Sequence, residues 1–184
     1  MELFCFWPKY KYLPMHQSPI HIRNSGLIIV STYLPILFQR AELMKTDAPA
    51  FGSIANQHRA VELLHYLVHA QLPSDNTGLE LNKVLCGINP IDEIVLSHTV
   101  GEHWAELRLS MWDALMNHWT AIKNISLPGL LETFVIREGR LETVEEKRHL
   151  QVQRKTIDVV VDQLPWAISV VNYNWMEKPL FNTW

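Results

Sequence analysis

Apolar residues recur with helical spacing in several stretches of the chain. Val61, Leu64 and Val68 share one helix face, and Ser53 is a suitable N-cap, so a helix is predicted from there to about Ala70. A capping box at Thr77 and a stop at Gly87 delimit a shorter one. The same spacing predicts further helices over about residues 27–41 (interrupted by Pro35), 97–119 and 126–134.

The period changes from helical to alternating after residue 137. Leu150, Val152 and Arg154 alternate with two glutamines, which predicts a strand. Residues 139–143 can pair with this strand across the charged loop at 144–149. The sequence therefore predicts a β-hairpin near the C-terminal end.

Two apolar runs downstream, at 159–161 and 167–171, are too short for periodicity to separate helix from strand. We therefore expect a mainly α fold, in which a compact helical domain over residues 20–184 carries one small β-hairpin. Residues 1–19 contain three prolines and are expected to form an irregular N-terminal arm.

Composition narrows the function classes. The chain has 184 residues, the usual size of one domain, and a net charge of −3, which disfavours a nucleic-acid binder because no basic face is visible. Its 2 cysteines make neither a disulfide framework nor a metal quartet, which favours a reducing compartment. We expect no signal peptide and no membrane span.

One helix face carries candidate metal ligands. His58, Glu62, His65 and His69 fall on the same side of the predicted helix over 53–70. The i, i+4 spacing of the last two can place two imidazoles on one metal ion. The plainer interpretation is a polar edge beside the apolar face, and it is favoured because no further ligand can be assigned from spacing.

A carboxylate pair, Asp158 and Asp162, is the second candidate for chemistry. Neighbouring carboxylates can act as acid and base when one pKa is raised. Capping, turn formation or pairing with Arg154 or Lys155 is the favoured interpretation. No nucleophile elbow or phosphate-binding glycine loop is present, so no catalytic residue is predicted.

Aromatic residues gather at the end of the sequence. Trp166, Trp175, Phe181 and Trp184 lie in its last segment, together with Tyr173. The favoured interpretation is that this segment folds back onto its own core. The alternative is that part of it docks into a partner, because buried tryptophans dominate interface energetics. These four residues are therefore the candidate partner-binding residues.

The same segment, 158–184, resembles the C-terminal signature of the tape-measure proteins of contractile injection systems, which are phage-tail-like particles. Further segments resemble the family in the same order, and together the resemblance covers about residues 20–184. They are Ile22–Leu27, Leu34–Phe38, Leu63–Gln71, Leu81–Gly87, His118–Ser126, Gly129–Phe134 and Arg137–Leu141.

The resemblance implies a structural role in tube length control or tail assembly, with no catalysis and no cofactor. It implies partners among the other tail proteins, namely the tube, cap or baseplate. We expect assembly in the cytoplasm, with incorporation into a released particle as a further outcome. Two alternatives stay open: a small metal-dependent enzyme that uses the His/Glu helix face, and a helical adaptor unrelated to injection particles.

Overall fold

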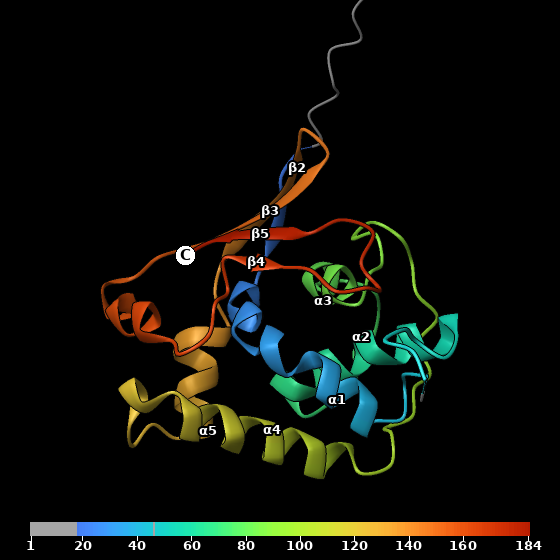
Figure 1. Ribbon diagram of the computed structural model, residues 1–184, viewed down its shortest axis with the longest axis horizontal. Coiled ribbons are helices and arrows are strands. Elements are labelled where there is room, and N and C mark those ends of the chain that lie inside the picture. Colours follow the sequence, from blue (N-terminus) through green and yellow to red (C-terminus); the bar gives the residue numbers. More distant parts are fainter. Residues whose placement is uncertain (1–17, 46) are drawn as a thin grey trace, which may run out of the picture.

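The computed structural model describes residues 18–45 and 47–184 (Figure 1). The expected arm over residues 1–19 lies outside the described residues, apart from its last two. Five strands form one mixed sheet in the order β1-β2-β3-β5-β4. They are β1 (Ile20–Ile22), β2 (Gly139–Val144), β3 (Lys147–Val152), β4 (Val170–Val171) and β5 (Leu180–Thr183). β3 and β5 are parallel, and the other neighbouring strands are antiparallel.

The sheet shows that the expected mainly α fold is wrong, because the protein combines helices with a five-stranded sheet. The predicted hairpin is confirmed as β2–β3, but it is the centre of a larger sheet. β1, β4 and β5 have two to four residues each, too few for an alternating pattern to be read. Their pairing with the hairpin is also non-local, which periodicity does not encode.

The centre of the core is a 3₁₀ helix, η1 (Ser25–Tyr33), whose residues 25–31 are all buried. It leads directly into α1 (Leu34–Arg40), and the two elements together cover the helix predicted over about residues 27–41. Pro35 lies in the first turn of α1, where a missing N–H removes no intrahelical bond, so it begins this helix rather than interrupting one.

Two predicted N-caps are confirmed. The Ser53 hydroxyl accepts from the Asn56 N–H at the start of α2 (Ile54–His69), and Ser126 accepts from Gly129 at the start of α5 (Leu127–Leu130). A π-helical turn, η3 (Leu131–Val135), follows α5. The capping box at Thr77 is wrong, because no side chain caps α3 (Glu80–Leu85).

The long helix α4 (Trp104–His118) begins later than predicted. His98 and His103 both have positive φ, which keeps the chain irregular up to that point. Beyond α4 lies a single 3₁₀ turn, η2 (Thr120–Ile122). The apolar run at 159–161 falls inside the 3₁₀ helix η4 (Thr156–Gln163), and the run at 167–171 ends in β4.

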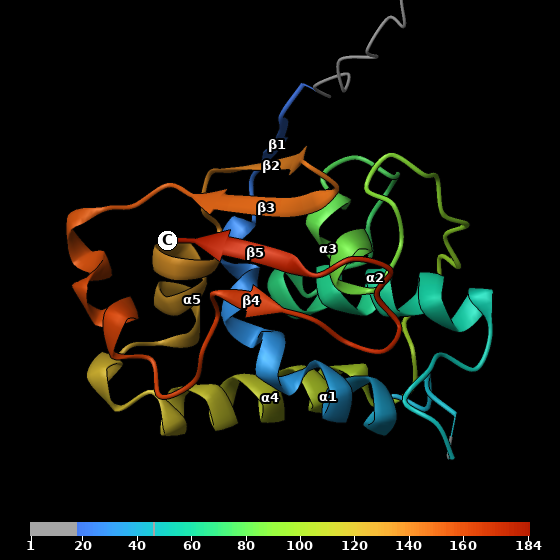
Figure 2. The same ribbon diagram turned by 45° about the horizontal axis from the view of Figure 1, so that its top comes forward.

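The helices pack against one face of the sheet (Figure 2). The strands match this arrangement, because Leu141, Leu150 and Leu180 are buried whereas Arg140 and Gln151 are exposed. The turn of the β2–β3 hairpin projects beyond the helices (Figure 1). Among the described residues, no helix combines the length and the hydrophobicity that crossing a membrane requires.

Candidate functional site

The three C-terminal tryptophans among the candidates are anchored inside the chain. The indole N–H of Trp166 donates to the Ile29 carbonyl at 3.0 Å, and that of Trp175 donates to the Leu85 carbonyl at 3.0 Å. Trp184 donates to the Asp158 carboxylate at 2.9 Å. All three rings are half-buried against the core, so this part of the segment folds back as the favoured interpretation expected.

Phe181 differs from the three tryptophans. Its neighbour Leu180 points into the core, so Phe181 lies on the outer face of β5. There its ring stacks on His149, with 5.4 Å between centroids, and Val170 of β4 is its register partner. The side chain of Val170 is 48% exposed. The outer face of the sheet therefore carries a small apolar surface at Phe181.

A buried ion pair joins the tail to the base of the hairpin. Both Arg137 and Asp158 have side chains with 0% exposure, and they pair through two hydrogen bonds of 2.8 and 3.1 Å. The Asp158 carboxylate also accepts from the Lys155 N–H at 2.7 Å and from Trp184. Burial alone would raise the pKa of Asp158, but the hydrogen bonds and the charge of Arg137 outweigh it and lower that pKa.

The two candidate acid–base carboxylates are thus held in separate ion pairs. The sequence predicted capping, turn formation, or pairing with Arg154 or Lys155. Asp158 does cap the start of η4, because its carboxylate accepts from the Lys155 N–H. Asp162 does pair with Arg154, on the surface. Asp158 instead binds Arg137, which is distant in sequence. Each carboxylate accepts hydrogen bonds from a cation, so the arrangement is that of a structural clamp.

The candidate His/Glu face is divided between two roles. Glu62 is fully buried and accepts from Arg59 at 2.6 Å and from the Ser97 N–H at 2.8 Å. His58 accepts from the Val95 N–H at 3.2 Å. Both side chains therefore hold the loop that precedes α4.

His65 and His69 face each other, with ring centroids 4.4 Å apart. Burial, together with the charge of His69, lowers the pKa of His65 to about 4, and burial lowers that of His69. Within residues 18–45 and 47–184, no three His, Cys, Asp or Glu side chains gather in a way that could bind a metal ion.

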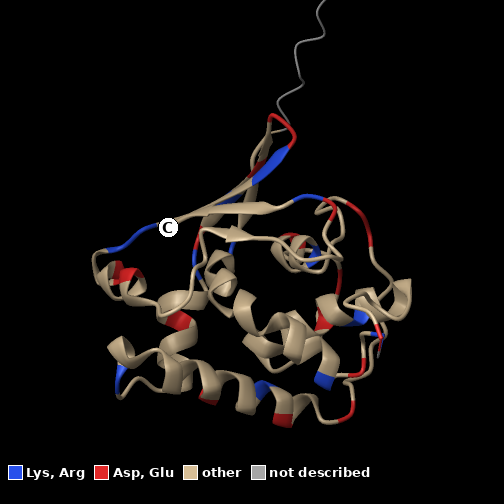
Figure 3. Ribbon diagram, viewed as in Figure 1, with Lys and Arg blue, Asp and Glu red and all other residues tan. Residues whose placement is uncertain are grey.

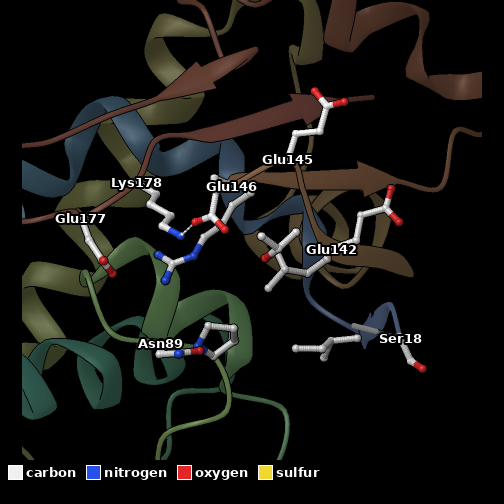
Figure 4. A pocket seen from close by; sticks show the side chains of 12 residues that line it. Ser18, Asn89, Glu142, Glu145, Glu146, Glu177 and Lys178 are labelled. Carbon is white, nitrogen blue, oxygen red and sulfur yellow. Dashed lines mark hydrogen bonds and ion pairs between the residues drawn. The ribbon is translucent and has the colours of Figure 1, made fainter. Parts of the chain in front are cut away.

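A cleft of about 470 Å³ lies beside the projecting end of the hairpin (Figure 4). One wall comes from Leu141, Thr143 and Arg148 of the hairpin. The opposite wall comes from Asn89 and Pro90, which follow α3. Its rim also carries four glutamates and one lysine: Glu142, Glu145, Glu146, Glu177 and Lys178. Figure 4 shows Lys178 directed at Glu146, with which it pairs.

Arg148 is the unusual residue of this cleft. It is only 6% exposed, yet its Nη1 atom has no hydrogen-bond partner among the described residues. Burial lowers the pKa of Arg148, and the nearby carboxylates of Glu177 and Asp92 offset part of this effect without pairing with it. The cleft thus presents a buried donor inside an acidic rim. Figure 3 shows the acidic residues, in red, at the turn of the β2–β3 hairpin.

Arg148 was not among the residues predicted from the sequence, because it falls in the predicted charged loop at 144–149. A signal was present, since Arg148 precedes Leu150 and Val152 in the same alternation, which puts it on the buried face of the strand.

Residues 12–184 match the family model of the contractile injection system tape measure protein. The chain belongs to this family. The match covers the sheet, the clamp and the cleft, and it confirms the resemblance seen in the sequence. No curated protein and no solved structure matches the chain. Two of the segments that resembled the family meet in the fold of this tape measure protein. Arg137 comes from one of them, Asp158 and Trp184 come from the other, and hydrogen bonds to the Asp158 carboxylate join the three residues.

Proposed function

We propose that this tape measure protein is a non-enzymatic assembly component of a phage-tail-like particle, and that its folded unit docks onto other tail proteins. The family match over residues 12–184 carries the proposal. The described residues form a layered α/β unit rather than an extended rod. Its part in setting tube length would therefore depend on attachment to the tube, cap or baseplate.

The outer face of the sheet is the docking surface that the geometry favours. Trp166, Trp175 and Trp184 already use their indole N–H groups within the chain. Phe181 is the candidate partner-binding residue that does not pack against the core. An aromatic ring next to exposed apolar side chains is typical of protein–protein contacts. Assembly would take place in the cytoplasm, with the protein retained in the released particle.

Electron microscopy of particles from cells with and without the gene tests the proposal. We expect loss of particles or scattered tube lengths without the gene, and unchanged yield and length would contradict the assembly role. Rescue with Phe181→Ala then tests the surface. Leu109→Ala is a matched control, because Leu109 is 53% exposed on α4, in the helical layer. We expect the control to rescue fully and Phe181→Ala to rescue poorly.

A further inference from the structure

The cleft beside the hairpin turn contains an unsatisfied donor. A guanidinium that is removed from water and left without an acceptor is unfavourable, and such groups in folded proteins are nearly always paired. Arg148 is buried and its Nη1 lacks a partner among the described residues. Because Arg148 lines the cleft, an acceptor that enters it can reach this residue.

The backbone at this end of the hairpin is also unfavourable. Val144 pairs with Lys147, so Glu145 and Glu146 form a two-residue turn. Both have positive φ, 48° and 65°, a conformation that favours Asn and Gly over Glu. An unpaired buried donor and a turn with unfavourable residues thus lie around one cleft, and such unfavourable features are typical of functional sites.

The charges around the cleft limit what can enter. A planar guanidinium binds a carboxylate best, through two parallel hydrogen bonds. The glutamates of the rim repel a free polyanion such as nucleic acid and attract cationic side chains. A volume of about 470 Å³ accommodates a side chain with its neighbouring residues.

We infer that this cleft binds a segment of a partner tail protein, in which an Asp or Glu side chain pairs with Arg148 and flanking Lys or Arg side chains pair with the acidic rim. The inference rests on the proposed function, because it names the chemistry by which the docking partner is recognised. The cleft faces the inner side of the hairpin, so this contact is separate from the surface at Phe181.

Arg148→Met gives the sharpest test, because the two possible roles of the residue predict opposite results. If Arg148 serves binding, the variant removes an unpaired buried charge and we expect the melting temperature to stay level or rise by about 2–4 °C. If Arg148 serves the fold, the melting temperature falls, which would overturn the inference.

Binding is measured with the full chain and the peptide acetyl-Lys-Asp-Lys-amide, by following the Arg148 side-chain Nε–H signal in an NMR titration. We expect a saturable shift with this peptide and at least a tenfold weaker effect with acetyl-Lys-Asn-Lys-amide. Arg148→Lys keeps the charge without the planar fork and should lose most of the binding, as judged by backbone amide shifts of the cleft. No shift with the Asp peptide would overturn the inference, and so would an equal shift with sodium acetate, which would indicate a small-anion site.

Incorporation into purified particles links the cleft to assembly. We expect Arg148→Met to be incorporated at least tenfold less than the wild type, and Arg40→Met to be unaffected. Arg40 is a matched control because it is exposed on α1, where its guanidinium donates to the Ser110 hydroxyl. Equal incorporation of Arg148→Met would overturn the inference and leave the proposed function standing. Absence of the wild-type protein from particles would instead contradict the proposed function, while the peptide titration still decides whether the cleft binds a carboxylate segment.

Discussion

Two buried arginines lie near opposite ends of the same hairpin, and their surroundings differ sharply. Arg137 precedes β2 and bonds Asp158 as well as the carbonyls of Thr133 and Gln153. Arg148 lies near the turn, and its Nη1 has no partner among the described residues. The guanidinium of Arg137 is therefore fully supplied with hydrogen-bond acceptors, as expected of a buried ion pair that stabilises the fold. We interpret the unsatisfied one as reserved for a partner.

The largest effect is expected from breaking the satisfied site. Asp158→Asn leaves Arg137 buried without a counter-charge, so we expect the free energy of unfolding to fall by about 3–5 kcal/mol. Urea denaturation followed by tryptophan fluorescence measures this loss.

Asp162→Asn is the matched control for Asp158→Asn. Its ion pair with Arg154 is exposed on both sides, with 45% and 58% of the side chains accessible, so we expect a loss below about 1 kcal/mol. Similar small losses in the two variants would show that the buried pair does not stabilise the fold.

A second, smaller loss of stability is expected when the contact between Trp184 and the Arg137–Asp158 pair is removed. Trp184→Phe keeps an aromatic ring but removes the hydrogen bond to the charged Asp158, which we expect to lower the free energy of unfolding by about 1.5–3 kcal/mol. Trp175→Phe removes a bond to a neutral carbonyl and should lower it by about 0.5–1.5 kcal/mol. Thermal and urea unfolding of the two variants compare them, and a larger loss in Trp175→Phe would refute a charge-assisted bond at Trp184.

The satisfied site could be predicted only in part. The hairpin is local, so the alternation at Leu150 and Val152 was enough to predict it. The partner of Asp158 was missed because Arg137 lies 21 residues away, and only the packing of η4 against the hairpin base brings them together. Local spacing offered Arg154 and Lys155 as charged partners instead, whereas the capping role of Asp158, which is local, was among the roles predicted.

The unsatisfied site was harder to predict for a different reason. The strand alternation could have placed Arg148 on the buried face, but its lack of an acceptor depends on Asn89, Pro90 and Glu177, which come from distant segments. The same holds for β1, β4 and β5, whose pairing is decided by tertiary contacts. Helices with a continuous apolar face, such as α2, were predicted from sequence because their pattern is local.

Lowering the pH protonates Asp158 and so tests its contribution to the free energy of unfolding. Its pKa in the folded protein is lowered, so its contribution to stability is complete above the ordinary Asp pKa of about 3.9 and is lost as the pH falls through the lowered value. We expect the difference in unfolding free energy between wild type and Asp158→Asn to be constant above about pH 5. Below about pH 4 it should narrow by up to about 1.4 kcal/mol per pH unit.

Urea midpoints between pH 3 and 7 measure this narrowing. His65 does not interfere with this comparison, because both proteins carry it and its effect cancels in the difference. Its pKa is lowered to about 4, so its contribution to the free energy of unfolding is lost in both proteins as the pH falls from about 6.5 to 4. A difference that stays constant down to pH 3 would mean that Asp158 is not the titrating group.

The smallest change in the free energy of unfolding is expected at the turn beside Arg148. It tests whether the backbone conformation of this turn lowers the stability of the protein. Replacing Glu145 and Glu146 by Asn and Gly supplies the residues that positive φ favours, and we expect a gain of about 0.4–1 kcal/mol in the free energy of unfolding. The lost pair with Lys178 is exposed and offsets little of this gain. Glu142→Gln removes an acidic side chain from the same rim without changing the turn, so it should leave the stability unchanged.

If the double variant gains stability yet binds the Lys-Asp-Lys peptide less well, the acidic turn is retained for recognition. If it gains nothing, the turn is not strained, and the contrast between the two ends of the hairpin rests on Arg148 alone.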